Sequence, residues 1–142
     1  MTKITKTLLA ASLLAAATPI FAAVQTGSLG NDSSATDFYL ITCPDATTYQ
    51  LNFNIMDTLA NSAPIVSGQV SKGFAALSTN DLTDTDKLYG PAINVIGGAG
   101  NYLLTVDKNA AGVENYSFNY TCKTTAGVAT RKAATITNLQ NQ

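Results

Sequence analysis

The sequence predicts an all-β protein: an antiparallel β-sandwich, of jelly-roll or immunoglobulin-like type, with about seven or eight short strands and one disulfide. Three observations lead to this prediction. Short runs of alternating apolar and polar residues recur along the chain, and clusters of glycine, proline, asparagine and aspartate separate them. Two cysteines, Cys43 and Cys122, have the same parity as the apolar residues in their alternating runs. Such alternation is typical of strands that bury one face.

The first 23 residues have the pattern of a secretory signal peptide. Lys3 and Lys6 form the basic start, residues 8–17 the apolar centre, and Ala22 and Ala23 the small residues of a cleavage site. We expect cleavage after Ala23. The apolar centre is shorter than the roughly 20 residues that a bilayer-spanning helix needs, and no later segment is longer. The mature chain is therefore expected to be exported, into the periplasm or the extracellular space, with no transmembrane segment.

The remaining chain is predicted to consist of an arm and a single domain. Residues 24–36 show no periodicity and many small polar side chains, which predicts a flexible N-terminal segment. Residues 37–142 contain all of the predicted strands. Their length suits one domain with one core.

The strands follow from period-two patterns of differing clarity. The clearest lies at residues 49–55, where aromatic and aliphatic side chains occupy one face and Gln50, Asn52 and Asn54 the other. The predicted strands are residues 38–43, 49–55, 65–71, 74–78, 92–96, 102–107 and 116–122, with a weaker candidate at 129–137. Only residues 56–61 and 78–88 have room for a helical turn.

The two cysteines are predicted to form the disulfide. Cys122 has the same parity as Tyr116 and Phe118, and Cys43 has the same parity as Tyr39 and Ile41, so both thiols should point into the core. An exported protein usually oxidises such a pair; two separate buried thiols are the alternative. Closing a loop of about 80 residues stabilises a chain by at most about 4 to 5 kcal/mol in the chain-entropy treatment.

The residue inventory argues against catalysis. The chain has no histidine, which excludes histidine metal sites and the Ser-His-Asp and Cys-His mechanisms. Its one glutamate, Glu114, lies in a Gly-Val-Glu-Asn segment that is predicted to be a solvated connection. A glycosidase needs two facing carboxylates, and no pattern supplies them. We therefore expect a protein that is not an enzyme, and a small hydrolase is the least supported function.

Charge also limits the partners. Without residues 1–23 the chain has six basic and nine acidic side chains, and Arg131 and Lys132 are its one adjacent basic pair. Binding to nucleic acid or to an anionic membrane needs concentrated lysine and arginine. A protein or carbohydrate ligand at the cell envelope is expected instead, with self-association as a further option.

No cofactor is expected, although one loop has the composition of a weak calcium site. Asp81, Asp84 and Asp86 are close in sequence, and calcium prefers several oxygen ligands from one loop. The spacing lacks the central glycine and terminal glutamate of an EF-hand. A solvated turn is the preferred interpretation.

Two further features have the composition of binding elements. The glycine-rich residues 97–100 lead into a strand pattern, so they predict a tight turn and not a phosphate-binding loop. Most of the tyrosines share parity with core residues, and Tyr89 is the one expected to be exposed. A carbohydrate platform of tyrosines is therefore less expected than core packing.

The region between Asp37 and Cys122 resembles the bacterial pre-peptidase C-terminal domain. The resemblance rests on the Phe-Tyr strand opening at residues 38–39, the pattern at residues 49–53, and Gly-Asn-Tyr-Leu-Leu-Thr-Val at residues 100–106 followed by Tyr-Ser-Phe at residues 116–118. It covers about 85 residues and implies a compact β-sandwich with a supporting role in secretion, folding or substrate binding. We expect this chain to differ from that pattern, since no catalytic domain is predicted in it and a disulfide is.

These observations favour a non-catalytic binding or accessory module that presents loops from a disulfide-bonded β-sandwich. The loops at residues 79–91 and 97–101 are the expected binding elements. The alternative is a structural subunit of a surface or extracellular filament, which would polymerise through an edge strand or a donated arm. Residues 24–36 lack the alternating apolar residues that a donor strand uses.

Overall fold

The structure is a computed structural model that describes residues 22–59, 64–83 and 86–142. Within these residues it contains nine β-strands and no helix, and hence no helix that could cross a membrane. The strands are β1 (Ala23–Leu29), β2 (Asp37–Cys43), β3 (Gln50–Asp57), β4 (Val66–Lys72), β5 (Ala75–Asn80), β6 (Ile93–Ile96), β7 (Gly100–Lys108), β8 (Glu114–Lys123) and β9 (Thr135–Gln140).

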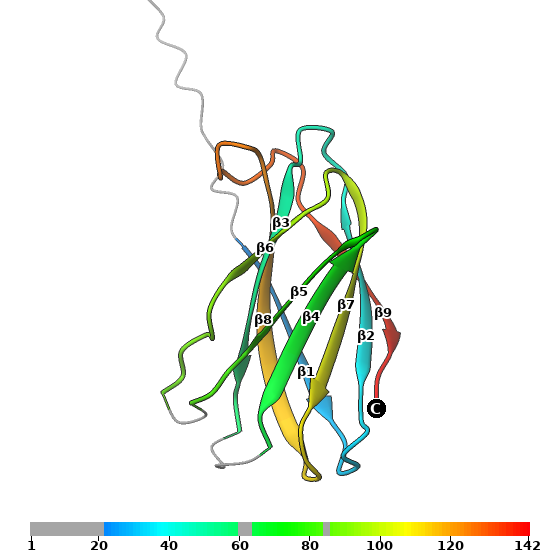
Figure 1. Ribbon diagram of the computed structural model, residues 1–142, viewed down its shortest axis with the longest axis vertical. Coiled ribbons are helices and arrows are strands. Elements are labelled where there is room, and N and C mark those ends of the chain that lie inside the picture. The colour runs from blue at the N-terminus through cyan, green and yellow to red at the C-terminus, as the bar shows by residue number, and fades with distance from the viewer. Residues whose placement is uncertain (1–21, 60–63, 84–85) are drawn as a thin grey trace, which may run out of the picture.

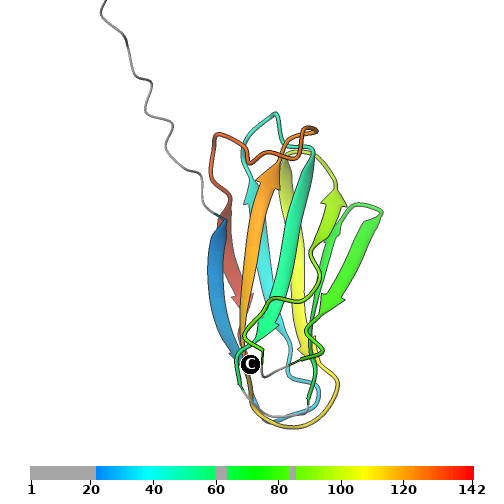
Figure 2. The same ribbon diagram turned by 90° about the vertical axis from the view of Figure 1, so that its left-hand side faces the viewer.

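The strands form two antiparallel sheets that pack face to face (Figure 1). One sheet has the order β1-β8-β3-β6, and Figure 2 shows β1, β8 and β3 side by side. The other has the order β5-β4-β7-β2-β9. The all-β sandwich predicted from the sequence is thus confirmed.

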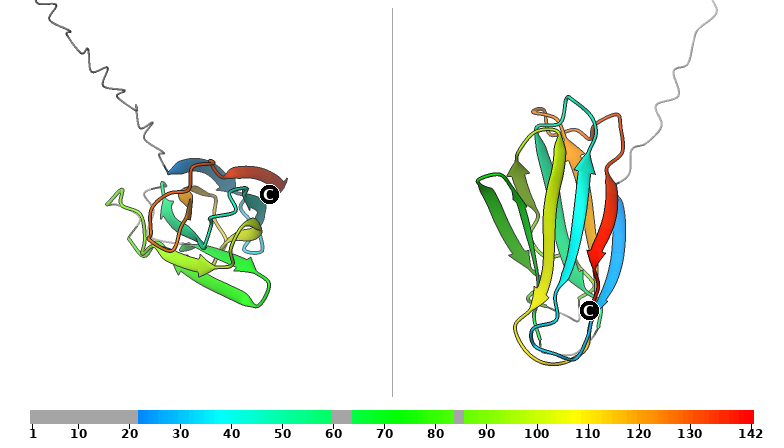
Figure 3. Two further views of the ribbon diagram at one scale, coloured as in Figure 1. Left: turned by 90° about the horizontal axis from the view of Figure 1, so that it is seen from above. Right: turned by 90° about the vertical axis from the view of Figure 1, so that its right-hand side faces the viewer.

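The pairing of the first eight strands is that of a jelly roll. β1 pairs with β8, β2 with β7, β3 with β6, and β4 with β5. The chain is therefore equivalent to one long antiparallel ribbon, folded at the β4–β5 turn and wound into two sheets. β9 adds a fifth strand beside β2, and it lies next to β1 on one side of the sandwich (Figure 3).

The predicted strands correspond to β2 through β8, with ends that differ by at most two residues. The weak candidate at residues 129–137 is shifted: the strand there, β9, spans Thr135–Gln140. The described parts of residues 56–61 and 78–88 contain no helical turn.

One prediction about the N-terminal segment was wrong. Residues 24–29, predicted to be part of a flexible arm, belong to β1, and all seven residues of β1 pair with β8. Its inward side chains are small or polar until Leu29, which is fully buried. The proposed cleavage site follows the first residue of this strand, while residues 1–21 of the expected signal peptide lie outside the described part of the chain.

The core lies between the sheets and follows the predicted alternation. Leu51, Phe53 and Ile55 of β3 are fully buried, and the inward aromatic side chains of β8 are almost fully buried. Phe118 is central because its ring contacts four others, those of Tyr39, Phe53, Tyr116 and Tyr120, at centroid distances of 5.3 to 6.1 Å. Aromatic clusters of this kind bury a large apolar area with edge and offset contacts.

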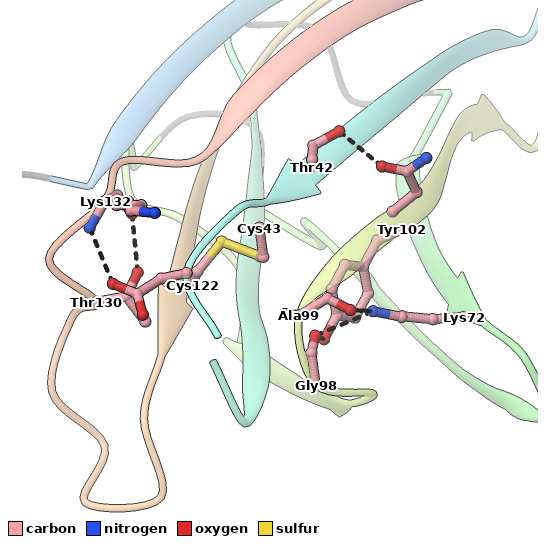
Figure 4. The surroundings of a disulfide bond; sticks show 11 residues. Thr42, Cys43, Lys72, Gly98, Ala99, Tyr102, Cys122, Thr130 and Lys132 are labelled. Carbon is pink, nitrogen blue, oxygen red and sulfur yellow. Dashed lines mark hydrogen bonds between the residues drawn. A yellow bond between two sulfur atoms is a disulfide. The ribbon is translucent and has the colours of Figure 1, made fainter. Parts of the chain in front are cut away.

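The predicted disulfide is present and joins the two sheets. Cys43 ends β2 and Cys122 lies near the end of β8, with their Cα atoms 5.7 Å apart and a sequence separation of 79 (Figure 4). Both are almost fully buried. We call this end of the sandwich the disulfide end.

A buried hydrogen-bonded cluster occupies the opposite end. The Tyr116 hydroxyl donates to the Asp37 carboxylate and lies 2.6 Å from the Tyr39 hydroxyl. Burial, followed by the hydrogen bond to Asp37, raises the pKa of Tyr116, so the phenol stays protonated and can donate. Gly27 makes room for the ring: a Cβ at this position would lie 2.2 Å from the Tyr116 hydroxyl oxygen.

Candidate functional site

The two loops predicted to bind do not form one surface. Residues 81–92 join β5 to β6, and residues 97–99 join β6 to β7, so they lie at opposite ends of the four-residue β6. The second loop is held at the disulfide end, where the Lys72 ammonium donates to the carbonyls of Gly98 and Ala99 (Figure 4). A joint binding site of both loops is not supported by this arrangement.

The three aspartates of the calcium hypothesis differ in their surroundings. Asp81 is buried, and its carboxylate accepts hydrogen bonds from the backbone N–H groups of Asp57 and Thr83. Asp86 is exposed and accepts from the Leu88 N–H, while Asp84 lies outside the described residues. Among the described residues no group of three potential ligands is placed to hold a metal ion. Calcium binding therefore stays a prediction.

Glu114 is not solvated as predicted. It is the first residue of β8, opposite Leu29 of β1, and its side chain is fully buried. The prediction failed because β8 begins two residues earlier than the alternation of its aromatic residues suggests. Glu114 has the parity of Tyr116 and Phe118, which places it on the inward face.

A cleft at the disulfide end has a volume of about 590 Å³ and lies between residues 45–47 and 124–131. The carboxylate that lines this cleft belongs to Asp45. It accepts hydrogen bonds from the N–H and hydroxyl of Thr47 and from the N–H of Lys132. The Thr47 N–H is the main reason that the pKa of Asp45 is lowered. Because these bonds stay within the loops, Asp45 has a structural role here.

The outer face of the four-stranded sheet is the surface with the most uniform chemistry. Since the odd-numbered residues of β3 are buried in the core, its even-numbered residues point outward, and in β8 the odd-numbered residues do so. Six amide side chains occupy these outward positions. We call this surface the amide face: Gln50, Asn52, Asn54, Asn94, Asn115 and Asn119.

The register of the strands brings these amides together. Asn54 is directly opposite Asn119, and Asn52 lies between Asn94 on one side and Thr121 on the other. Neighbouring strands are about 4.8 Å apart, so adjacent side chains can contact one ligand. The face is therefore an array of amide and hydroxyl groups, with the apolar side chains of Val24, Met56 and Ile96 at other outward positions.

Three of the six amides are committed to internal hydrogen bonds. The Asn94 carbonyl oxygen accepts from the side-chain amides of Gln50, at 3.0 Å, and Asn52, at 2.9 Å. Within the part of the chain that the structure describes, the side-chain amides of Asn54 and Asn119 form no hydrogen bond with other protein groups. Both are half-buried, so their donors and acceptors are available at the surface.

The amide face contains almost no charge. At the outward positions of β1, β3, β6 and β8 the one ionisable side chain is Lys123, at the corner next to the disulfide. Asp57 and Glu114, which belong to the same strands, point inward and are buried. A ligand on this face would meet neutral donors and acceptors.

Tyr89 borders the amide face. Its hydroxyl lies 2.9 Å from the Ser117 hydroxyl, which is on the outward side of β8 between Asn115 and Asn119. The adjacent Gly90 N–H donates to the Ile55 carbonyl, which fixes this segment alongside β3. Tyr89 was predicted to be exposed, and it is half-buried.

Sequence reasoning found part of this face. The alternation in β3 identified the outward position of Gln50, Asn52 and Asn54. It could not add Asn94, Asn115 and Asn119, because which strands are neighbours depends on long-range register. An excess of asparagine at the polar positions of two or more strands was the available signal.

Comparisons of this chain with protein-family models, with curated proteins and with solved structures find no match. The resemblance to the pre-peptidase C-terminal domain thus stays a prediction.

Proposed function

We propose that this protein is an exported, non-catalytic binding module whose amide face binds a neutral polysaccharide at the cell envelope or outside the cell. The observation that carries the proposal is the paired Asn54 and Asn119, whose amides are available at the centre of an uncharged array. The jelly-roll fold itself hosts many functions and does not carry the argument.

The chemistry of the face suits a sugar polymer. Each primary amide offers both a donor and an acceptor, and neighbouring sugar hydroxyls require both at short spacing. The lack of charge disfavours anionic polymers, for which arginine and lysine would be expected. Tyr89 contributes a half-buried aromatic ring at the border, where the apolar face of a sugar ring could pack.

The test is retention of the purified protein in gels that contain neutral polysaccharides, such as glucomannan, xylan and dextran, with anionic alginate for comparison. We expect retention by at least one neutral polymer and no retention by alginate. The double variant N54A/N119A should bind about ten-fold more weakly or worse, since it removes two hydrogen-bonding groups of about 1 kcal/mol each. Retention should persist at high salt because the face is neutral.

The matched control is Gln69→Ala. Gln69 is an exposed amide on β4, in the other sheet, so its loss should leave retention unchanged. The proposal fails if no neutral polymer in the panel retains the protein, or if N54A/N119A binds as well as the parent protein does.

A further inference from the structure

Charge is distributed unevenly between the two ends of the sandwich. Of the described residues, the disulfide end has four basic side chains, Lys72, Lys123, Arg131 and Lys132, and one acidic side chain, Asp45. Its basic character follows from the topology. β4 and β8 both end there, and residues 131–132 lie in the loop after β8, with Lys132 near the Cys43–Cys122 bond (Figure 4).

The opposite end, which we call the acidic end, has the reverse charge. Its described acidic side chains are Asp32, Asp37, Asp57, Asp81, Asp86, Asp107 and Glu114, and its basic side chains are Lys87 and Lys108. β1, β3, β5 and β7 end there, and β2 and β8 begin there. Lys108 is buried and donates to the backbone carbonyls of Gly30 and Gly112, so it adds little to the surface.

The charges that a partner could reach are also opposite in sign. Arg131 and Lys132 are exposed at the disulfide end. Among the described residues of the acidic end, three acidic side chains, Asp32, Asp86 and Asp107, and one basic side chain, Lys87, are exposed. The sequence shows only a small net charge and conceals this separation.

Each end also exposes apolar side chains. Phe74 projects fully into solvent at the β4–β5 turn, and Val128 is 60% exposed in the loop after β8. At the acidic end Leu82 is 70% exposed and Leu88 64% exposed. A contact between the two kinds of end would thus combine opposite charges with apolar surface that excludes water.

We propose that copies of this protein associate head to tail, with the disulfide end of one copy against the acidic end of the next. The partner is a second copy because one molecule presents both complementary surfaces. Such a contact is heterologous, so it leaves one free end of each kind and can add further copies into an open chain or a ring. The proposal does not depend on polysaccharide binding.

Self-association through a donated arm is less consistent with the structure. β1, the segment that could act as an arm, already pairs along its whole length with β8 of its own chain. End-to-end contact needs no strand to leave its sheet. The fold of each copy therefore stays intact on assembly.

The test is sedimentation velocity of the purified protein over a range of concentrations at low and high salt. The screening length is about 30 Å at 0.01 M salt and about 3 Å at 1 M salt. We expect the average mass to rise with concentration at low salt and to fall to that of the monomer at high salt. A monomer at low salt throughout the concentration range would overturn the proposal.

Two charge-reversed variants make the test specific. R131E/K132E makes both ends acidic, and D86K/D107K makes the acidic end basic, so each variant alone should remain monomeric at low salt. An equimolar mixture should associate again, because every end then finds an opposite one. Gln69→Glu/Thr137→Glu, two changes at exposed mid-strand positions of β4 and β9 away from both ends, is the control and should associate like the parent protein.

Thermal melts of each variant establish that it is folded before its mass is interpreted. Folded variants that associate alone as the parent does, or that fail to associate when mixed although the parent protein does, would contradict the head-to-tail contact. The same samples distinguish this proposal from the previous one, since polysaccharide retention should be unchanged by salt and by both charge-reversed variants.

Discussion

The disulfide end and the acidic end of the sandwich are closed by different chemistry. At the disulfide end a covalent bond joins β2 to β8. At the acidic end the same two strands are joined by a hydrogen-bonded cluster, in which the Tyr116 hydroxyl of β8 donates to the Asp37 carboxylate of β2. Both contacts keep the two sheets together where the core ends, one by a covalent bond and the other by hydrogen bonds.

The disulfide and the hydrogen-bonded cluster respond differently to the solution conditions. The disulfide bond is independent of pH but is lost in reducing conditions. The carboxylate cluster is independent of redox state but needs Asp37 as an acceptor. Asp37 also accepts from the Gln142 N–H, so this one side chain secures three parts of the chain. Each end therefore has its own vulnerability.

The largest effect is expected from removing the covalent bond. The double variant C43A/C122A should lose about 4 kcal/mol of unfolding free energy, because the unfolded chain regains the entropy of a loop of about 80 residues. Urea denaturation of this variant and of the parent protein measures the loss. A loss well below 1 kcal/mol would show that the hydrogen-bonded end alone holds the sheets together.

A smaller loss is expected at the acidic end. Tyr116→Phe keeps the ring but removes the hydroxyl, which leaves the buried Asp37 and Tyr39 with one hydrogen-bonding partner fewer. Such a deletion costs about 1 to 3 kcal/mol. Tyr49→Phe is the control, since that ring is 39% exposed and its loss of a hydroxyl should be nearly neutral. Equal stabilities of the two variants would contradict the role of the cluster.

The smallest effect is expected from acid. Hydrogen bonds from Thr47 lower the pKa of Asp45 at the disulfide end, and hydrogen bonds from Ser34 lower the pKa of Asp32 at the acidic end. A carboxylate with a lowered folded-state pKa stabilises the fold above its unfolded pKa of about 4, and this contribution is lost as the pH falls through the folded-state value.

The variants D45N and D32N should therefore each weaken the decline of stability in acid. Urea midpoints measured between about pH 5 and pH 2 would detect the difference. An unchanged pH dependence in both variants would mean that other carboxylates dominate the acid response. A change in only one variant would identify which end opens first in acid.

The sequence predicted the parts of this fold that depend on local pattern. Residues 49–55 could be assigned to a strand, and Cys43 and Cys122 to the interior, because parity alone decides which face is buried. β1 was missed because its inward positions are Ala23, Gln25 and Gly27, which have little or no apolar surface. Gly27 is required there by the Tyr116 ring, a contact that only the paired strands reveal.

The candidate surfaces were less predictable than the strands. The amide face needs the register of β3 with β6 and β8, and the charge separation needs the direction of every strand. Neither can be obtained from a local window of sequence. Glu114 illustrates the same limit, since its burial depends on pairing with β1.

The long-range strand pairing of the jelly roll determines when in its synthesis or export this chain can fold. Of the strands that follow one another in sequence, only β4 and β5 pair with each other, and every other ladder joins segments separated by further strands. The backbone groups of β1 can form their hydrogen bonds only after β8, which ends at Lys123, is available for pairing. A polypeptide with such distant pairings folds slowly. If the chain is exported as proposed, it would remain unfolded during translocation until almost all of it has crossed the membrane.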